Sequence, residues 1–301
     1  MKHIIVLILL AILPLHEVRA QYNTNRLIIS GQSALYYEDY VLSIQYFNQA
    51  LAAKPYLYEP WFYRGLAKFY LDDYTGSEAD VTKSIELNPY VFNMFELRGL
   101  CRIRQKHYAQ AIDDYTRSIN LNPQNQTAWY NRALCRIEDK DYVQAQLDLD
   151  TVITRWKSYA SAYSLKAQVY LLQADTLTAD KWLDKSLQVA PYDVDAWNMR
   201  GMIALSRAEW KNADTYLSKV IHLKPKNAAN YVNRALARYN TNNLRGAMSD
   251  YDTAIDFDPD NFLAHYNRGL LRMNLGDDNR AIEDFDYVIR MEPKNVLAIF
   301  N

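Results

Sequence analysis

Few side chains in this 301-residue sequence have the types and spacing that enzyme or metal chemistry requires. Outside the first 20 residues, the histidines are His107, His222 and His265, and the two cysteines are Cys101 and Cys135. These residues do not form a Cys/His/carboxylate set with metal-ligand spacing. The sequence also has no glycine-rich phosphate loop and no nucleophile elbow. It therefore predicts a protein that is not an enzyme and that uses no metal or cofactor.

A basic residue and an aspartate recur together along the chain. The basic residue returns every 34 positions, at Arg64, Arg98, Arg132, Lys166, Arg200, Arg234 and Arg268. An aspartate lies 16 residues after five of them, at Asp80, Asp114, Asp148, Asp250 and Asp284. We expect these residues to form exposed ion pairs between antiparallel helices, each contributing about 0–1 kcal/mol. The functional alternative is a basic stripe that binds an acidic partner.

The prolines follow the same spacing, which defines the elements that hold these residues. Successive prolines lie 34 residues apart, with Lys157 at the one place where a proline is missing: Pro55, Pro89, Pro123, Pro191, Pro225, Pro259 and Pro293. The period divides the chain into eight repeats: 24–57, 58–91, 92–125, 126–159, 160–193, 194–227, 228–261 and 262–295. Each repeat holds two short helical patterns, so an unbroken period of this length predicts an all-α solenoid. We expect one elongated domain over residues 21–295.

Within each repeat, a bulky residue stands at position 4 and small residues stand at positions 8 and 20, as in Trp61, Gly65 and Ser77. Small residues at these places let two antiparallel helices approach closely. The pattern resembles the tetratricopeptide repeat (TPR) family, in its exported bacterial form. That resemblance implies a right-handed superhelix of eight helix–turn–helix repeats that binds protein partners.

The repeats also bear on the two cysteines. Cys101 and Cys135 both stand at position 10, in the first helices of neighbouring repeats. Packed helix axes lie about 8–10 Å apart, whereas a disulfide needs Cα atoms within about 7 Å. We therefore predict two free, buried thiols, although the expected export would favour a disulfide.

Residues 1–20 have the form of a secretory signal peptide. Lys2 precedes a ten-residue apolar run from Ile4 to Leu13, and Val18 and Ala20 supply small residues for cleavage. The run is shorter than the roughly 20 apolar residues of a membrane-spanning helix. We therefore expect an exported, periplasmic or secreted protein with no stable membrane span after cleavage, although an uncleaved amphipathic anchor is the alternative. The near-neutral charge argues against a nucleic-acid partner.

The family resemblance implies that positions 5 and 13 of the first helices help to line a concave groove. The candidate peptide-binding residues at these positions are Tyr36, Phe62, Tyr70, Arg104, Tyr130, Glu138, Asn198 and Tyr266. This set is aromatic and slightly acidic, which suits an extended or helical peptide. It lacks the cationic clamp with which the family's chaperone-tail receptors hold a terminal carboxylate. The alternative is that some of these residues simply pack the stack.

Two places depart from the pattern. Arg155-Trp156-Lys157-Ser158 replaces the usual Asn-Pro turn, so we expect the preceding helix to run on and bend the stack. Residues 296–301 begin an incomplete ninth repeat, which leaves the last helix pair without a polar cap. This end indicates either a piece of a longer repeat protein or a partner that covers it, including self-association through the C-terminal repeat.

Together these features predict a non-catalytic scaffold that binds peptide or protein partners in its groove, in cell-envelope assembly. The alternative is a structural spacer or subunit of a larger envelope complex that uses the convex face. An enzyme or a carbohydrate-binding protein would need a pocket that no local motif supplies.

Overall fold

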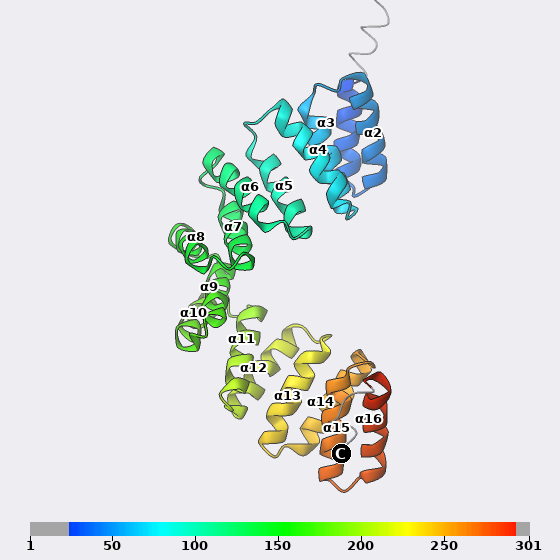
Figure 1. The fold of residues 1–301 in the computed structure, drawn as a ribbon, viewed down its shortest axis with the longest axis vertical. Helices are drawn as coiled ribbons and strands as arrows, with labels where there is room; N and C mark the ends of the chain where they lie inside the picture. The colour runs from blue at the N-terminus through cyan, green and yellow to red at the C-terminus, as the bar shows by residue number, and fades with distance from the viewer. Residues whose placement is uncertain (1–23, 293–301) are drawn as a thin grey trace, which may run out of the picture. The chain divides into compact units, whose positions relative to one another are not determined.

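The computed structural model of the chain describes residues 24–292 (Figure 1). Within this range the regular structure is helical, with turns between the helices and no strand, which confirms the all-α prediction. The expected signal peptide (1–20) and the incomplete ninth repeat (296–301) lie outside the described residues. None of the helices in residues 24–292 is both long and apolar enough to cross a membrane.

The contacts divide the chain into two compact units, residues 1–155 and 156–301. In the first unit, residues 24–36 are helical. They are followed by α2 (Tyr40–Ala53), α3 (Tyr58–Tyr70), α4 (Tyr74–Leu87), α5 (Phe92–Arg104), α6 (Tyr108–Leu121), α7 (Gln126–Glu138) and α8 (Tyr142–Arg155). The second unit holds α9 (Ala160–Leu172), α10 (Thr176–Val189), α11 (Val194–Ser206), α12 (Trp210–Leu223), α13 (Ala228–Asn240), α14 (Leu244–Phe257), α15 (Phe262–Asn274) and α16 (Asp278–Met291).

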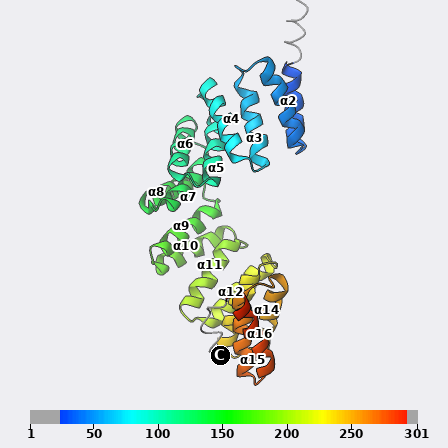
Figure 2. The same cartoon turned by 45° about the vertical axis from the view of Figure 1, so that its right-hand side comes forward.

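The helices within each unit form an ordered stack. The odd-numbered helices from α3 to α15 are the first helices of their repeats, with 13 residues each, whereas the second helices have 14. Within each unit, each helix from α2 onward packs against the next along the chain, and some first helices of neighbouring repeats also touch, as α3 and α5 do. The pairing can be followed within each unit in Figures 1 and 2. The packing is that of a repeat solenoid, as the period predicted.

The turn inside each repeat has one backbone geometry. Position 15 has a positive φ in all eight repeats, at Glu38, Asp72, Lys106, Lys140, Ala174, Ala208, Asn242 and Gly276. Around Asp72, the amide of Asp73 donates to the Lys68 carbonyl at 3.0 Å and the amide of Asp72 donates to the Phe69 carbonyl at 3.1 Å. These two bonds end α3 in a Schellman motif. The Asp73 side chain then accepts from the amide of Gly76 and caps α4. The chain therefore reverses within three residues.

The core of each helix pair depends on the small residue at position 8. A Cβ atom added at Gly99 would lie 2.9 Å from Cζ of Tyr115, and one added at Gly201 would lie 2.9 Å from Leu217. Tyr115 and Leu217 both stand at position 24 and are fully buried. The glycine therefore lets the facing side chain lie directly on the first helix.

We expect Gly65→Leu to lower the free energy of unfolding by about 1–3 kcal/mol, because the new side chain would overpack the core. Its Cβ alone would lie 2.8 Å from Val81 Cγ2 and 3.2 Å from the backbone oxygen of Ser77. Urea unfolding measures the change. Ala79→Leu on the exposed face of α4 is the matched control and should change the stability by no more than about 0.5 kcal/mol. An unchanged midpoint for Gly65→Leu would refute this packing.

The expectation that the helix before Trp156 runs on was wrong. α8 ends at Arg155 and has 14 residues, like the other second helices. The segment after it forms a turn without the proline, closed by the amide of Tyr159 on the carbonyl of Trp156 at 3.0 Å. The Tyr163 hydroxyl also donates to the Lys157 carbonyl at 3.0 Å. In other repeats the indole of a position-4 tryptophan donates to the proline carbonyl at the same place, as Trp129 does to Pro123. The hydrogen bond from the position-4 side chain to the turn carbonyl therefore does not require a proline.

Candidate interaction surfaces

Four of the predicted groove residues form a row at the carboxyl ends of first helices in the first unit. Tyr70, Arg104 and Glu138 are the last residues of α3, α5 and α7, and Tyr36 ends the helix before α2. All four are exposed, with Tyr36 at 81% and Tyr70 at 54% of their full accessibility. We call Tyr36, Tyr70, Arg104 and Glu138 the helix-end row. Each lies beside the left-handed turn of its repeat, where its side chain is available to a partner.

The other four predicted residues lie near the start of first helices and are only half-exposed. Phe62 meets Tyr63 edge-on, with ring centroids 5.2 Å apart, and packs against the core around Val81. The ring centroids of Tyr266 and Phe285 lie 5.9 Å apart. Phe62 and Tyr130 share the first unit with the helix-end row, eight residues upstream and hence about 12 Å away along the helix. Asn198 and Tyr266 belong to the second unit. Phe62 and Tyr266 therefore also contribute to packing.

The predicted ion pairs between positions 7 and 23 are present. Arg64–Asp80, Arg98–Asp114, Arg132–Asp148, Arg234–Asp250 and Arg268–Asp284 have nitrogen–oxygen distances of 2.6–2.7 Å. The expectation that they are exposed was wrong, because the aspartates retain only 2–5% of their side-chain accessibility. The second helix packs against the first helix of its own repeat, so the carboxylate is buried between the two helices.

Each buried aspartate also binds a second cation, at position 11, which sequence reasoning missed. The additional partners are Lys68, Arg102, Arg136, Arg238 and Arg272, at 2.6–2.9 Å. These residues share the 34-residue period, so their spacing was a usable signal. The position-7 arginines also reach back to the preceding repeat, as Arg132 does to the Thr116 hydroxyl at 3.0 Å. They are therefore part of the stack, which argues against the basic-stripe alternative.

Two repeats without the aspartate put an aromatic ring in its place. In the fifth repeat, the Lys166 ammonium lies 4.2 Å and the Lys185 ammonium 4.0 Å from the Trp182 ring centroid. In the sixth repeat, the Arg200 guanidinium lies 5.4 Å from the Tyr216 ring. Cation–π contacts therefore take the place of the ion pair at these two positions.

The prediction of two free, buried thiols is confirmed. Cys101 on α5 donates to the Ser77 hydroxyl at 3.1 Å. Burial raises the pKa of Cys101 to about 11 and the pKa of Cys135 to about 12. Both side chains are therefore thiols at neutral pH, which makes them poor nucleophiles.

These thiols should make the protein less stable in alkali. An unfolded cysteine ionises near pH 8.5, well below the folded pKa values of both residues. Their contribution is complete below about pH 8.5 and is lost as the pH rises towards the folded values. We expect the urea midpoint of the Cys101→Ala/Cys135→Ala variant to fall less between pH 8 and pH 10.5 than that of the wild type. Parallel curves would contradict this assignment.

Burial alters the ionisation of the Glu96 carboxyl on α5. Burial raises its pKa, and a hydrogen bond with Asn125 partly offsets the effect. Burial acts on Glu78 of α4 in the same direction, but hydrogen bonds from Arg102 and Gln105 outweigh it and lower the pKa of Glu78.

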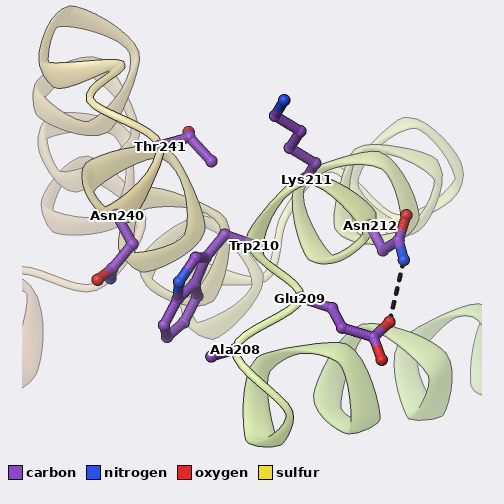
Figure 3. Close-up of a pocket in the computed structure, with 7 residues that line it drawn as sticks. All are labelled: Ala208, Glu209, Trp210, Lys211, Asn212, Asn240 and Thr241. Atoms are coloured by element: carbon purple, nitrogen blue, oxygen red, sulfur yellow. Dashed lines mark hydrogen bonds between the residues drawn. The ribbon is translucent and has the colours of Figure 1, made fainter.

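A shallow cavity of about 560 Å³ lies in the second unit, where the turn before α12 meets the end of α13. The Trp210 indole extends between Ala208 and Asn240 (Figure 3). The Asn240 amide donates to the Leu236 carbonyl at 2.9 Å, and Glu209 accepts from Asn212 at 3.0 Å. These polar groups already have partners within the protein. The residues that line this cavity were not among the candidate site residues predicted from the sequence.

Among residues 24–292, no group of three or more His, Cys, Asp or Glu side chains is arranged to hold a metal ion. The comparisons with known proteins point to one family. Models described as tetratricopeptide repeat match residues 97–146 and 263–295, and one described as TPR repeat matches residues 237–276. No curated protein matches the chain.

Several solved structures share the fold. A tetratricopeptide repeat protein from Parabacteroides merdae is 19% identical, with 81% of this chain and 96% of that chain covered and a TM-score of 0.58. YrrB, a TPR protein with an unusual peptide-binding site, is 22% identical, with 62% and 96% covered and a TM-score of 0.55. PilF of Pseudomonas aeruginosa is 14% identical, with 68% and 94% covered and a TM-score of 0.56. Such folds generally serve as non-catalytic scaffolds for protein–protein interaction. With its stacked 34-residue helix pairs and these matches, the chain belongs to the tetratricopeptide repeat family.

Proposed function

We propose that this protein is a non-catalytic scaffold that holds a peptide or protein partner against the first helices of its repeats. The observation that carries the proposal is the helix-end row, four long side chains exposed at equivalent places in four successive repeats. Half-exposed Phe62 and Tyr130 on the same helices add apolar area. An extended peptide could use both sets, with the aromatic rings as anchors and Arg104 and Glu138 as polar contacts. The peptide-binding site of YrrB, a similar fold, agrees with this use.

The test compares two sets of residues on the first helices of the first unit, in crosslinking with mass spectrometry performed in the native cell. Phe62→Ala/Tyr130→Ala and Arg104→Ala/Glu138→Ala should each abolish the crosslinks that the wild type forms. The second pair is exposed, so its thermal midpoint should match that of the wild type. Crosslinks that survive both variants would overturn the use of this face.

A structural spacer that binds through the second helices is the second candidate. Val143 and Leu147 on α8 lie one helical turn apart and are 64% and 55% exposed. Val143→Ser/Leu147→Ser should leave partner capture intact if the first helices bind the partner, and should remove it if the second helices do.

We also propose that the chain can associate with itself through the C-terminal repeat (262–295). Sedimentation of the wild-type protein at several concentrations tests this self-association.

We also propose that the protein acts outside the cytoplasm, in cell-envelope assembly. The support is the pattern of residues 1–20, with a basic start, an apolar run and small residues at the cleavage positions. The intact mass of the exported protein should correspond to a chain that begins at Gln21. Retention of the intact leader in the cytoplasmic fraction would contradict export.

A further inference from the structure

Two neighbouring turns in the first unit expose an unusual amount of aromatic surface. They are the turns of the first and second repeats, and their residues Tyr36, Tyr37, Glu38, Tyr40, Tyr70 and Asp72 form what we call the turn patch. Tyr36 and Tyr37 are 81% and 76% exposed, and Leu71 and Val41 beside them are 45% and 59% exposed. Grouped exposure of this kind typically marks an interaction site.

The rings in the turn patch hold one another in place. Tyr40, at the start of α2, stacks on Tyr70, at the end of α3, with ring centroids 5.1 Å apart and planes 18° apart. Phe69 extends this contact, because it meets Tyr70 edge-on at 6.0 Å and Tyr74 at 5.4 Å. Tyr36 and Tyr37 form a second edge-on pair at 5.2 Å. The aromatic faces are therefore ordered before any partner binds, which lowers the entropy cost of binding.

Four carboxylates belong to the same two turns as these rings. Glu38, Asp39, Asp72 and Asp73 are all exposed, and none of them forms an ion pair with another residue in the described range 24–292. Asp39 and Asp73 accept backbone amides at helix starts, and Asp72 accepts the Tyr74 hydroxyl. Desolvation, the charge of Glu38 and the neighbouring Tyr70 together raise the pKa of Tyr40. The patch is negative as well as aromatic.

The charge reverses at the next turn. The third repeat has Arg104, Lys106 and His107 where the first two have tyrosines and carboxylates. This turn is adjacent, because Thr75 at the start of α4 donates to Gln105 at 3.3 Å. The edge of the first unit thus runs from an acidic, aromatic part to a basic part, so a partner would meet two different charges within three repeats.

We propose that the turn patch binds an arginine- or lysine-rich segment of a partner protein. The argument is charge complementarity. Cationic side chains can lie over the exposed tyrosine faces while they pair with Glu38 and Asp72, and both interactions favour the same charge. Acidic residues further along the segment would then face Arg104 and Lys106. The proposal rests on the proposed function in that the chain binds a protein partner, and the turn patch shares Tyr36 and Tyr70 with the helix-end row. It does not require Phe62 or Tyr130.

The test measures binding of fluorescein-labelled octa-arginine to the full chain by fluorescence anisotropy at low salt, with octa-glutamate as the opposite probe. Octa-arginine should bind and octa-glutamate should bind much more weakly. Tyr36→Ala/Tyr70→Ala and Glu38→Gln/Asp72→Asn should each weaken octa-arginine by about tenfold, since each removes one of the two attractions. Tyr70→Phe keeps the ring face and should retain most of the affinity.

The matched control is Asp139→Asn/Asp141→Asn, which removes two exposed carboxylates from the turn of the fourth repeat. It should change the affinity for octa-arginine by less than about twofold, because that turn has no exposed tyrosine pair. Equal losses in the control and the patch variants, or no loss on removing the tyrosines, would show non-specific attraction and overturn the proposal. Octa-arginine should still bind the Phe62→Ala/Tyr130→Ala variant. If that variant also keeps the crosslinks to its natural partner, the proposed function fails while the turn patch stands, so the two proposals can fail separately.

Discussion

Asp250→Ala should lower the free energy of unfolding by about 3–5 kcal/mol, the largest effect we expect from a charged residue. The Asp250 carboxylate is almost completely buried and accepts from Arg234 Nε at 2.9 Å, Arg234 Nη2 at 2.7 Å and Arg238 Nη1 at 2.9 Å. Alanine would leave two guanidinium groups partly desolvated with no carboxylate between them. Because alanine favours the helix, the loss cannot be assigned to helix propensity.

Asp252→Ala is the matched control on the same helix, α14. Asp252 is half-exposed and pairs with Arg268 at 2.8 Å, while Arg268 keeps its buried partner Asp284. This substitution should cost about 0–1 kcal/mol. Urea unfolding of both variants gives the comparison. Equal losses would mean that burial of the Asp250 carboxylate does not determine how much it contributes to the free energy of unfolding, which would contradict the prediction.

Tyr115→Ala should cost about 3–5 kcal/mol, because it empties the space between α5, α6 and α7. The Tyr115 ring is fully buried and lies directly against Gly99. Its hydroxyl oxygen has no hydrogen-bond partner within the described part of the chain, and burial strongly raises its pKa. The ring therefore contributes stability, whereas the buried hydroxyl contributes an uncompensated desolvation cost.

Tyr115→Phe separates these two contributions. It keeps the ring and removes the unpaired hydroxyl, so the variant should be as stable as the wild type or more stable by about 1 kcal/mol. Thermal unfolding of the Phe and Ala variants side by side tests the prediction. A loss of more than about 1 kcal/mol in Tyr115→Phe would show that the hydroxyl has a partner in solution, with Asn131 on α7 as the first candidate.

The repeating architecture and several contacts within a repeat could be predicted from the amino-acid sequence alone. Helix starts recur at the 34-residue spacing, from Tyr58 to Phe92 and on to Gln126. The pairing of Arg98 with Asp114 and the absence of a bridge between Cys101 and Cys135 both followed from that spacing. These features are predictable because an antiparallel helix pair brings fixed positions of one repeat to the same level, whatever surrounds the pair.

The depth at which each group is buried, and its contacts with neighbouring repeats, could be established only from the folded structure. It placed the Asp250 carboxylate in the interior with Arg238 as a second partner, and it ended α8 at Arg155 although the turn proline is missing. It also separated exposed Tyr70 from half-buried Phe62, two residues of one helix that the sequence treated alike. Burial depends on the rotation of each helix against its neighbours, and the period of a single chain does not specify that rotation.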